Sequence, residues 1–508
     1  MASSSLPLGK ATSATKITDL DEDSLAQCAS YLNLHDVCNL ASTCSFLKSV
    51  AYSDPIWQRF FREQWQKLPS SSLPTSGARD MYLARHTAVQ QFKFTDPFYC
   101  NLYATSDPVK DLFFARNAIF FSQGSIVQGI TMTSNPKGTT VDFLGMHSLR
   151  GHKARITCTR LFSLDEIPLS QGQTEREQNV LVTSSCDRTI RIWWKGSCLR
   201  CLRGHSSPVL SLSNKLLGDD SSKVLASGGE DGTVRLWSLG PSGKRGQHAL
   251  KATLHGHQKP VNLMSVAGHN TSLLVTIARD SKVRVWDTTV SSPIRSSGCV
   301  GMTSVPGVPI NMKCHESLLY VAAGSSVTAI DLRTMQKVIT AAVHQPKLYS
   351  FDIFPSKSLI CTGGDGRAML WDIRRNQEQS KPEPIAELDG HYGPVTLLHM
   401  DAYKIVTGGR NDENVNVWEA NTGEQTNSLL ACSSEDYGTK IGCDALAVNG
   451  SRIITAGGYD DASLLSFRDF NNATNVVTEL GKEPLSKFWD SMSDGNNNND
   501  LNLFIVCR

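Results

Sequence analysis

Apolar and polar positions alternate in short runs over most of the chain, and glycine-containing turns separate the runs. In the clearest case, Val224–Ala226 and Thr233–Trp237 flank the turn Gly229–Gly232, and Val234 and Leu236 alternate with polar neighbours. An apolar residue at every second position is typical of a strand with one buried face. This stretch therefore predicts a β-hairpin.

The hairpin pattern repeats along the chain. An Asp stands six residues before an aromatic residue at Asp187/Trp193, Asp231/Trp237, Asp280/Trp286, Asp365/Trp371, Asp412/Trp418 and Asp461/Phe467. Gly-His pairs precede several of these hairpins, at residues 151–152, 204–205, 256–257 and 390–391. A period of about 40 to 45 residues, with Gly-His near the start and Trp-Asp near the end, is typical of four-stranded propeller blades. The repeats resemble the WD-repeat family, most closely at Trp286-Asp287 and Trp371-Asp372.

Two further segments keep the alternation but lack the Asp and the Trp. They are Val109–Thr131, which contains three strand-like runs, and Tyr320–Ile330. Counting both, we predict a mainly β fold, a WD-repeat β-propeller with eight blades; seven is the alternative if residues 109–132 belong to an entry region. A closed ring needs a terminal strand that completes a blade built from the other end of the chain. The candidates are Gln91–Phe94, Asn475–Thr478 and Leu503–Val506.

Each repeat with a Gly-His pair also carries a Ser or Thr, an Asp and a Trp at matching positions. Ser, His and Asp form the catalytic set of many hydrolases. An enzyme needs one such site, whereas this chain repeats the set, and the WD-repeat resemblance implies a buried hydrogen-bond network in each blade. We therefore expect a structural role for His152, Asp187, Trp193, His205, Ser227, Asp231, Trp237, His257, Asp280, Trp286, Asp365, Trp371, His391, Asp412 and Trp418.

The spacing changes to that of helices near the N-terminus. Apolar residues follow i, i+3, i+4, i+7 from Leu25 to Leu32, and the same spacing begins again at Val37. We expect Asp36 to cap the second helix, and Asp54 followed by proline to open a third. The sequence thus predicts a small all-α module before the propeller.

Fragments of this module resemble the F-box, the motif that docks on a Skp-type adaptor. They are Ile17–Leu20, Ser30–Asp36, Leu40–Cys44 and Ser53–Trp57. Asp21 stands where the family usually has proline. In the family, apolar side chains of these helices contact the adaptor, which implies that role for Leu20, Leu25, Leu32, Leu34, Val37, Leu40 and Cys44. The alternative is a helical bundle that packs on the propeller as a cap and uses the same apolar spacing for its own core.

The changes of residue pattern divide the chain into segments. We expect a disordered leader (1–15), the F-box domain (16–66), a connector with a helix (67–96), the propeller (97–482) and a low-complexity tail (483–508) with a candidate strand at its end.

Composition and charge narrow the classes of function that fit the chain. With 50 basic and 48 acidic residues, the net charge of +2 gives no general attraction for nucleic acid or a membrane. Fourteen cysteines without framework spacing favour a reducing compartment, so we expect the nucleus or the cytoplasm.

We expect no cofactor and no metal site. Cys198 and Cys201 form a C-x-x-C pair, but i and i+3 on a strand point to opposite faces, and no second pair of ligands stands at the required spacing.

In propellers of this kind, the turn with the repeated Asp and the loop after Gly-His open on one rim, where partners often dock. The rim candidates are Arg155, Glu230, Lys259, Arg279, Lys347, Tyr392, Arg410 and Tyr459. Several basic groups on one rim suit an acidic or phosphorylated protein target, because Arg pairs bidentately with phosphate; the alternative is that they are solvated loop charges.

The two resemblances together imply a non-catalytic substrate receptor of a Skp-cullin-F-box ubiquitin ligase, with the adaptor and, through it, a cullin as partners. The alternative is a WD-repeat scaffold that assembles protein complexes without ubiquitin transfer.

Overall fold

The computed structural model describes residues 20–65, 77–94, 97–105, 107–115, 118–134, 141–163, 179–218, 223–239, 249–289, 298–343, 346–374, 382–433, 440–459, 462–470 and 505–507. Contacts divide the chain into two compact units, residues 1–90 and 91–508, and each is described by itself. The expected leader and the candidate strand Asn475–Thr478 lie outside the described residues. Within the described ranges, no helix is long and apolar enough to cross a membrane.

The first unit is built from helices with capped N-termini. They are α1 (Glu22–Ala29), α2 (Leu34–Thr43), α3 (Ser45–Ala51), α4 (Asp54–Trp65) and α5 (Ala78–Phe94), whose last residues belong to the second unit. Asp21, Asn33 and Cys44 each accept a hydrogen bond from the N–H three residues ahead, at 3.1, 2.8 and 3.4 Å. The prediction that Asp36 caps α2 was wrong: Asn33 is the cap, and Asp36 lies in the first turn.

A shared apolar core joins these helices. Trp57 of α4 is 3% exposed, donates its indole N–H to the Ala51 carbonyl (2.9 Å) and packs edge-on against Tyr82 of α5, with 5.3 Å between ring centroids. Asp54 at the start of α4 accepts the N–H of Ala78 at the start of α5 (3.0 Å). The core therefore includes α5, which extends the helical unit beyond the F-box fragments themselves.

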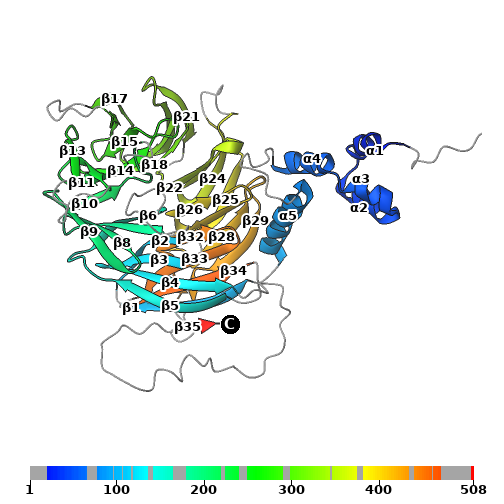
Figure 1. The fold of residues 1–508 in the computed structure, drawn as a ribbon, viewed down its shortest axis with the longest axis horizontal. Coiled ribbons are helices and arrows are strands. Elements are labelled where there is room, and N and C mark those ends of the chain that lie inside the picture. The colour runs from blue at the N-terminus through cyan, green and yellow to red at the C-terminus, as the bar shows by residue number, and fades with distance from the viewer. Residues whose placement is uncertain are drawn as a thin grey trace, which may run out of the picture. The chain divides into compact units, whose positions relative to one another are not determined.

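The second unit is an eight-bladed β-propeller (Figure 1), and each blade is an antiparallel sheet whose strands run outward in order. Blades 1 to 4 are, from the inner strand outward: β2 (Val109–Ala115), β3 (Ala118–Gln123), β4 (Ile126–Ser134), β5 (Val141–Leu149); β6 (Ile156–Ser163), β7 (Asn179–Ser185), β8 (Thr189–Trp194), β9 (Ser197–Arg203); β10 (Val209–Leu212), β11 (Val224–Gly229), β12 (Val234–Ser238), β13 (Leu250–Leu254); and β14 (Val261–Val266), β15 (Leu273–Ala278), β16 (Lys282–Asp287), β17 (Cys299–Ser304).

Blades 5 to 8 follow the same order: β18 (Pro309–His315), β19 (Leu318–Ala323), β20 (Ser326–Asp331), β21 (Lys337–Val343); β22 (Ser350–Phe354), β23 (Leu359–Gly363), β24 (Asp365–Asp372), β25 (Ala386–Pro394); β26 (Leu397–Met400), β27 (Lys404–Gly408), β28 (Asn414–Glu419), β29 (Gln425–Leu430); and β32 (Ala445–Asn449), β33 (Arg452–Tyr459), β34 (Ala462–Asp469), β1 (Phe98–Thr105). A short pair, β30 (Cys432–Ser433) and β31 (Lys440–Ile441), lies between blades 7 and 8 in sequence, and a 3-10 turn (Pro355–Lys357) joins β22 to β23.

The inner strands contact one another in a closed series, β2, β6, β10, β14, β18, β22, β26, β32 and back to β2. The degenerate segment from residue 109 to 131 is the first three strands of blade 1, so the prediction of eight blades is confirmed and the alternative of seven is excluded.

The ring closes through β1, which supplies the outer strand of blade 8. It pairs with β34 along its whole length, from Phe98 opposite Asp469 to Thr105 opposite Ala462. β35 (Ile505–Cys507), which overlaps one candidate closing strand, pairs with β1 on its other side. The prediction of a strand at Gln91–Phe94 was wrong, because a short alternating run does not separate strand from helix; these residues continue α5, and the buried Phe92 ring packs on Phe470 with 4.2 Å between centroids.

Candidate functional site

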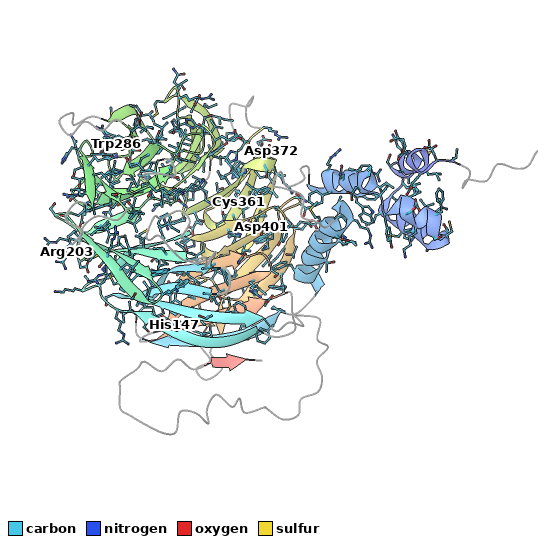
Figure 2. All side chains as sticks on the ribbon, viewed as in Figure 1. His147, Arg203, Trp286, Cys361, Asp372 and Asp401 are labelled. Atoms are coloured by element: carbon cyan, nitrogen blue, oxygen red, sulfur yellow. The ribbon has the colours of Figure 1, made fainter. Side chains whose placement is uncertain are left out.

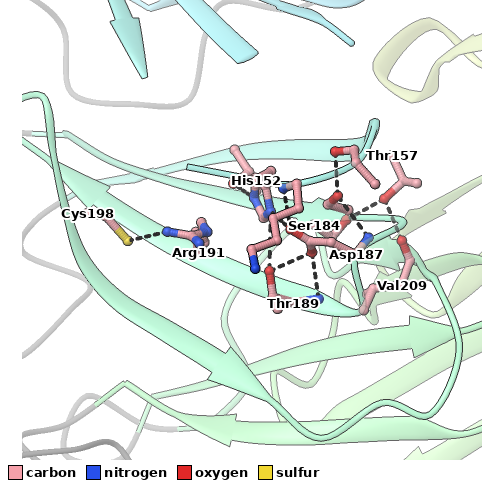
Figure 3. Close-up of polar contacts among 12 residues, drawn as sticks. His152, Thr157, Ser184, Asp187, Thr189, Arg191, Cys198 and Val209 are labelled. Atoms are coloured by element: carbon pink, nitrogen blue, oxygen red, sulfur yellow. Dashed lines mark hydrogen bonds and ion pairs between the residues drawn. The ribbon is translucent and has the colours of Figure 1, made fainter. Parts of the chain in front are cut away.

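The network expected in each blade is formed completely in blade 2, and Figure 3 shows its His152 and Asp187. His152 comes from the loop before β6, Thr183 from β7, Asp187 from the turn after β7, and Trp193 from β8. Thr183 Oγ1 accepts the indole N–H of Trp193 (2.8 Å) and lies 2.7 Å from His152 Nε2, while His152 Nδ1 lies 2.9 Å from Asp187 Oδ2. The Thr183 side chain is fully buried, so its hydroxyl, which links β7 to β8 and to the loop before β6, cannot reach a dissolved substrate.

Three other blades repeat this arrangement. The indole N–H donates to a hydroxyl at 2.8 Å in Trp237/Ser227, at 2.7 Å in Trp286/Thr276 and at 2.7 Å in Trp418/Thr407. The same hydroxyl lies 2.8 to 2.9 Å from the Nε2 of His205, His257 or His391. Trp286 is fully buried, and Figure 2 marks its position in the propeller.

The acidic member of the network differs between blades. Asp187, Asp231 and Asp412 lie 2.9, 3.3 and 2.9 Å from the Nδ1 of their histidines. In blade 4 the distance from Asp280 Oδ2 to His257 Nδ1 is 3.7 Å, and both atoms are buried without a hydrogen-bond partner.

The expectation that Asp365 belongs to a buried network was wrong. Asp365 is exposed at the start of β24, although Trp371 still donates to Thr362 (2.8 Å). Blade 6 has no Gly-His pair in its entry loop, and its turn places Asp365 three residues after Thr362, instead of the four that separate Thr183 from Asp187. The carboxylate therefore falls outside the interior of the blade.

The protonation equilibria agree with a buried neutral His and an ionised Asp. Burial lowers the pKa of His152 and His205, against the opposing effect of their carboxylate partners, and lowers the pKa of His257 to about 4. For Asp187, burial alone would raise the pKa, but hydrogen bonds from Thr189, the Lys153 N–H and His152 outweigh it and lower the pKa to about 2.

The turns that carry these Asp residues and the loops that enter the inner strands form one continuous surface, which we call the rim. Within blades, the Cys186 N–H donates to the Arg155 carbonyl (2.9 Å), and the Arg279 N–H donates to the Pro260 carbonyl (3.0 Å). Between blades, entry-loop N–H groups donate to the turn carbonyl of the preceding blade: Ile156 to Gly124 (2.7 Å), Leu348 to Gly324 (3.1 Å), Val395 to Gly364 (2.9 Å) and Cys443 to Gly409 (2.9 Å).

The expected rim residues lie on this surface, but they are not equivalent. Exposed side chains are those of Arg155, Glu230, Lys259, Arg279, Lys347, Tyr392 and Arg410, and Tyr392 is 94% exposed. Arg410 is paired with Asp444 of the next blade (Nε to Oδ1, 2.5 Å). The Tyr459 side chain lies outside the described part of the structure. The sequence analysis missed Lys153 and Arg188, which are exposed on blade 2 as Arg155 is; Lys153 directly follows the Gly-His pair, and Arg188 directly follows the repeated Asp.

The expected adaptor residues divide into two groups. Leu25 and Val37 are buried in the core of the helical unit, and Leu32, Leu34 and Leu40 are half-buried against it. Leu20 is 50% exposed and Cys44 is exposed. Tyr31, which the spacing did not single out because it lies outside the apolar stripe, is 80% exposed at the end of α1.

Comparison with known proteins gives two family matches. The WD domain, G-beta repeat family matches residues 145–193, 196–238, 249–287 and 335–372, and the F-box domain family matches residues 17–59. Both are generally non-catalytic interaction domains, and F-box domains generally bind Skp-type adaptors.

Similar proteins have diverse names. The guanine nucleotide-binding protein subunit beta of Arabidopsis thaliana is 24% identical and covers 66% of this chain and 86% of its own length. The ribosome biogenesis protein WDR12 homolog of Oryza sativa subsp. japonica is 25% identical (52% and 64%), and the kinesin-like protein KIF21B of Mus musculus is 26% identical (44% and 11%). The chain thus spans less than two thirds of the length of the last two. The crystal structure of the computationally designed Ika8 protein has a TM-score of 0.51 at 18% identity, with 71% of this chain and 96% of that chain covered, and shares the fold.

A helical unit that matches the F-box domain therefore precedes an eight-bladed propeller that carries WD repeats, and the chain is an F-box/WD-repeat protein.

Proposed function

We propose that this protein is the substrate-receptor subunit of a Skp-cullin-F-box ubiquitin ligase. The observation that carries the proposal is the F-box match over residues 17–59, joined in one chain to a WD-repeat propeller whose rim exposes charged side chains. The role is positional: the helical unit binds the adaptor, the rim binds the target, and the target lysines gain a high effective concentration near the ubiquitin-conjugating enzyme. We place this activity in the nucleus or the cytoplasm.

The exposed apolar side chains of the helical unit favour adaptor binding. The core around Trp57 is complete without Leu20 and Tyr31, so these two side chains leave apolar surface in contact with water. Burying such side chains in an interface contributes about 1.5 to 3 kcal/mol each. Leu25 and Val37 would support the interface indirectly, by holding α1 and α2 in place.

The rim favours an acidic or phosphorylated target. Among the described residues, no ion pair involves Arg155, Lys259, Arg279 or Lys347, whereas Arg410 is neutralised by Asp444. Free guanidinium groups pair bidentately with phosphate or carboxylate. Glu230 of blade 3 and Asp365 of blade 6 are exposed acidic residues on the same surface.

Co-purification with a Skp-type adaptor and a cullin tests the receptor role. We expect the full chain to capture both, and the double variant Leu20→Asp/Tyr31→Asp to lose capture, because charges at an apolar interface must be desolvated. The matched control is Met302→Asp, which introduces the same charge at a 54% exposed apolar position on the outer strand of blade 4; capture should be unchanged.

Loss of adaptor binding in the Leu20/Tyr31 variant with unchanged circular dichroism supports the receptor role. If the folded wild-type chain captures no adaptor, the protein is better described as a WD-repeat scaffold. One observation favours that second candidate: Leu25 and Val37, both expected at the adaptor interface, lie in the core of the unit itself.

A further inference from the structure

The outer strand of blade 4, β17, presents an exposed apolar edge at the periphery of the propeller (Figure 1). Its Val300 side chain is 61% exposed and its Met302 side chain is 54% exposed. β17 pairs with β16 on one side, and no strand in the described part of the chain pairs with its other side. This edge belongs neither to the rim nor to the helical unit.

Packing against the next blade determines which face of β17 is exposed. A Cβ atom at Gly301 would lie 2.6 Å from Met335 Cγ, in the turn between β20 and β21 of blade 5, so glycine allows this close approach. Successive side chains of a strand point to opposite faces. The Met302 side chain therefore points away from blade 5 and remains in contact with water.

The composition of β17 differs from that of most other outer strands. Charged side chains on an edge strand prevent its pairing with other chains. β17, with the sequence Cys-Val-Gly-Met-Thr-Ser, has none and lacks this protection. Five other outer strands have it: Asp142 in β5, Arg200 and Arg203 in β9, Lys251 in β13, Lys337 in β21, and Glu387 and Asp389 in β25.

The two remaining outer strands, β1 and β29, are also uncharged, but each contacts another element. In β29, which is mainly polar, Asn427 Nδ2 donates to the Phe92 carbonyl of α5 (3.1 Å). β1 pairs at residues 100–102 with β35, which is short, apolar and uncharged. The pairing of β1 with β35 shows which kind of segment covers an uncharged blade edge in this protein. β17 offers a longer regular edge, because residues 301–304 pair with β16 without interruption.

We propose that β17 binds an extended apolar segment of a partner protein, which adds to blade 4 as a fifth strand. Backbone hydrogen bonds along the edge supply affinity, and apolar side chains at alternating positions of the segment contact Val300 and Met302. The segment is uncharged at those positions, because a charge there would have to be desolvated. This inference does not rest on the proposed ligase role, since β17 is separate from the surface expected to bind the adaptor.

Selection from a displayed library of random peptides tests the proposal on the full chain. Peptides are kept if they bind the wild type and do not bind Met302→Asp. We expect the survivors to have β-branched or aromatic residues at alternating positions, with no charge at those positions. The matched control is Leu430→Asp, which places the same charge at a 48% exposed position on the outer strand of blade 7 and should bind these peptides as the wild type does.

Three outcomes of the selection overturn the proposal: no survivors, survivors without the alternation, or survivors that Leu430→Asp also fails to bind. Should Met302→Asp fail to fold, Val300→Asp takes its place. Because the receptor test measures capture of the adaptor, a failed peptide selection leaves the receptor role standing, and failed capture leaves this proposal standing.

N-methylation of a selected peptide separates strand pairing from a general apolar contact. Two versions of the peptide are made, each with the N–H groups of one edge replaced by N-methyl groups, so that donors are lost while the side chains stay the same. The version methylated on the edge that pairs with β17 should bind the wild type about tenfold more weakly or worse, and the other version should bind almost as tightly as the parent. Equal binding by the two versions overturns the proposal, and this comparison requires no variant of the protein.

Sedimentation velocity tests a second copy of this chain as the occupant of β17. We expect the wild type and Met302→Asp to sediment alike as monomers, because two β17 edges alone bury less surface than a stable homodimer requires. A wild-type dimer that Met302→Asp dissociates would make a second copy the occupant and would overturn the proposal of a partner segment.

Discussion

Removing the acidic residue of the blade network should destabilise the propeller by different amounts in different blades. In Asp187→Ala, the N–H groups of Lys153 and Thr189, which donate at 3.0 and 2.9 Å, lose their acceptor, as does the Thr189 hydroxyl (2.6 Å). His152 Nδ1 loses its shorter contact, to Asp187, and keeps the Thr189 hydroxyl at 3.2 Å. Each unsatisfied buried donor costs about 1 to 3 kcal/mol, but the exposed side of the turn regains water, so we expect a total loss of about 3 kcal/mol.

Two matched Asp→Ala variants test whether the loss of stability follows the number of hydrogen bonds that each Asp makes. Asp280→Ala removes the acceptor of the Lys282 N–H (3.0 Å), but it also removes an Oδ2 atom that is buried without a partner, so the loss should be about 1 kcal/mol. Asp365→Ala changes an exposed side chain and should stay within about 0.5 kcal/mol of wild type.

Differential scanning calorimetry of the three variants provides the measurement. In a unit of this size, each kcal/mol lowers Tm by about 1 to 2 °C. The expected order of Tm is Asp365→Ala, then Asp280→Ala, then Asp187→Ala as the lowest. Equal losses for Asp187→Ala and Asp280→Ala would refute the reasoning, because the two residues occupy equivalent sequence positions and differ only in their hydrogen bonds.

Two further predictions concern pH and ring closure. The pKa of His257 is about 4 in the folded protein and about 6.5 in the unfolded chain, so the unfolded chain binds the proton first and the free energy of unfolding decreases as pH falls from 6.5 towards 4. Replacing His257 with Gln should remove about 2 kcal/mol of the decrease in the free energy of unfolding between pH 7 and pH 5, measured by urea unfolding. An unchanged decrease would contradict this. A chain that begins at residue 106 lacks β1 and exposes the core residues Ile454 and Phe467 of blade 8, so it should aggregate in gel filtration, whereas a chain that begins at residue 91 should stay monomeric and folded; a monomeric, cooperatively folding chain from residue 106 would contradict this.

The repeat spacing, together with the alternation in the two degenerate segments, was sufficient to predict eight blades but insufficient to predict which blades contain the network. The distance from Asp to the aromatic residue is six in each of the six repeats that carry the pair, yet the distance from Ser or Thr to Asp is four in blades 2 to 4, three in blade 6 and five in blade 7. Asp412 keeps its place with the longer turn because His391 is present, whereas Asp365 has neither the histidine nor the turn length. The distance from Ser or Thr to Asp, together with the Gly-His pair, therefore predicts which blades contain the network, whereas the distance from Asp to the aromatic residue does not.

Other features depend on contacts that a sequence pattern does not contain. β1 closes the ring by pairing Phe98 with Asp469, and alternation alone does not identify a partner so distant in sequence. Likewise, the F-box resemblance implies the same adaptor contact for Leu20 and Leu25, but only Leu25 is buried by the helices of its own unit. Which apolar residues remain for a partner is decided by packing.

At residue 188, in the rim turn of blade 2, folding and the proposed binding role favour different amino acids. The residue after the repeated Asp has a positive φ in several blades: 68° at Arg188, 73° at Gly232 and 76° at Gly366. Glycine adopts this left-handed conformation without strain, whereas other residues pay about 1 kcal/mol or more. The hydrogen bonds of these turns come from the Asp side chain and from backbone groups, such as the N–H of Arg188 or Gly232, so they require no long side chain after the Asp. Folding alone therefore favours glycine at residue 188, whereas the arginine adds positive charge to the rim beside Arg155 and lowers stability, as we expect if the rim binds the proposed acidic target.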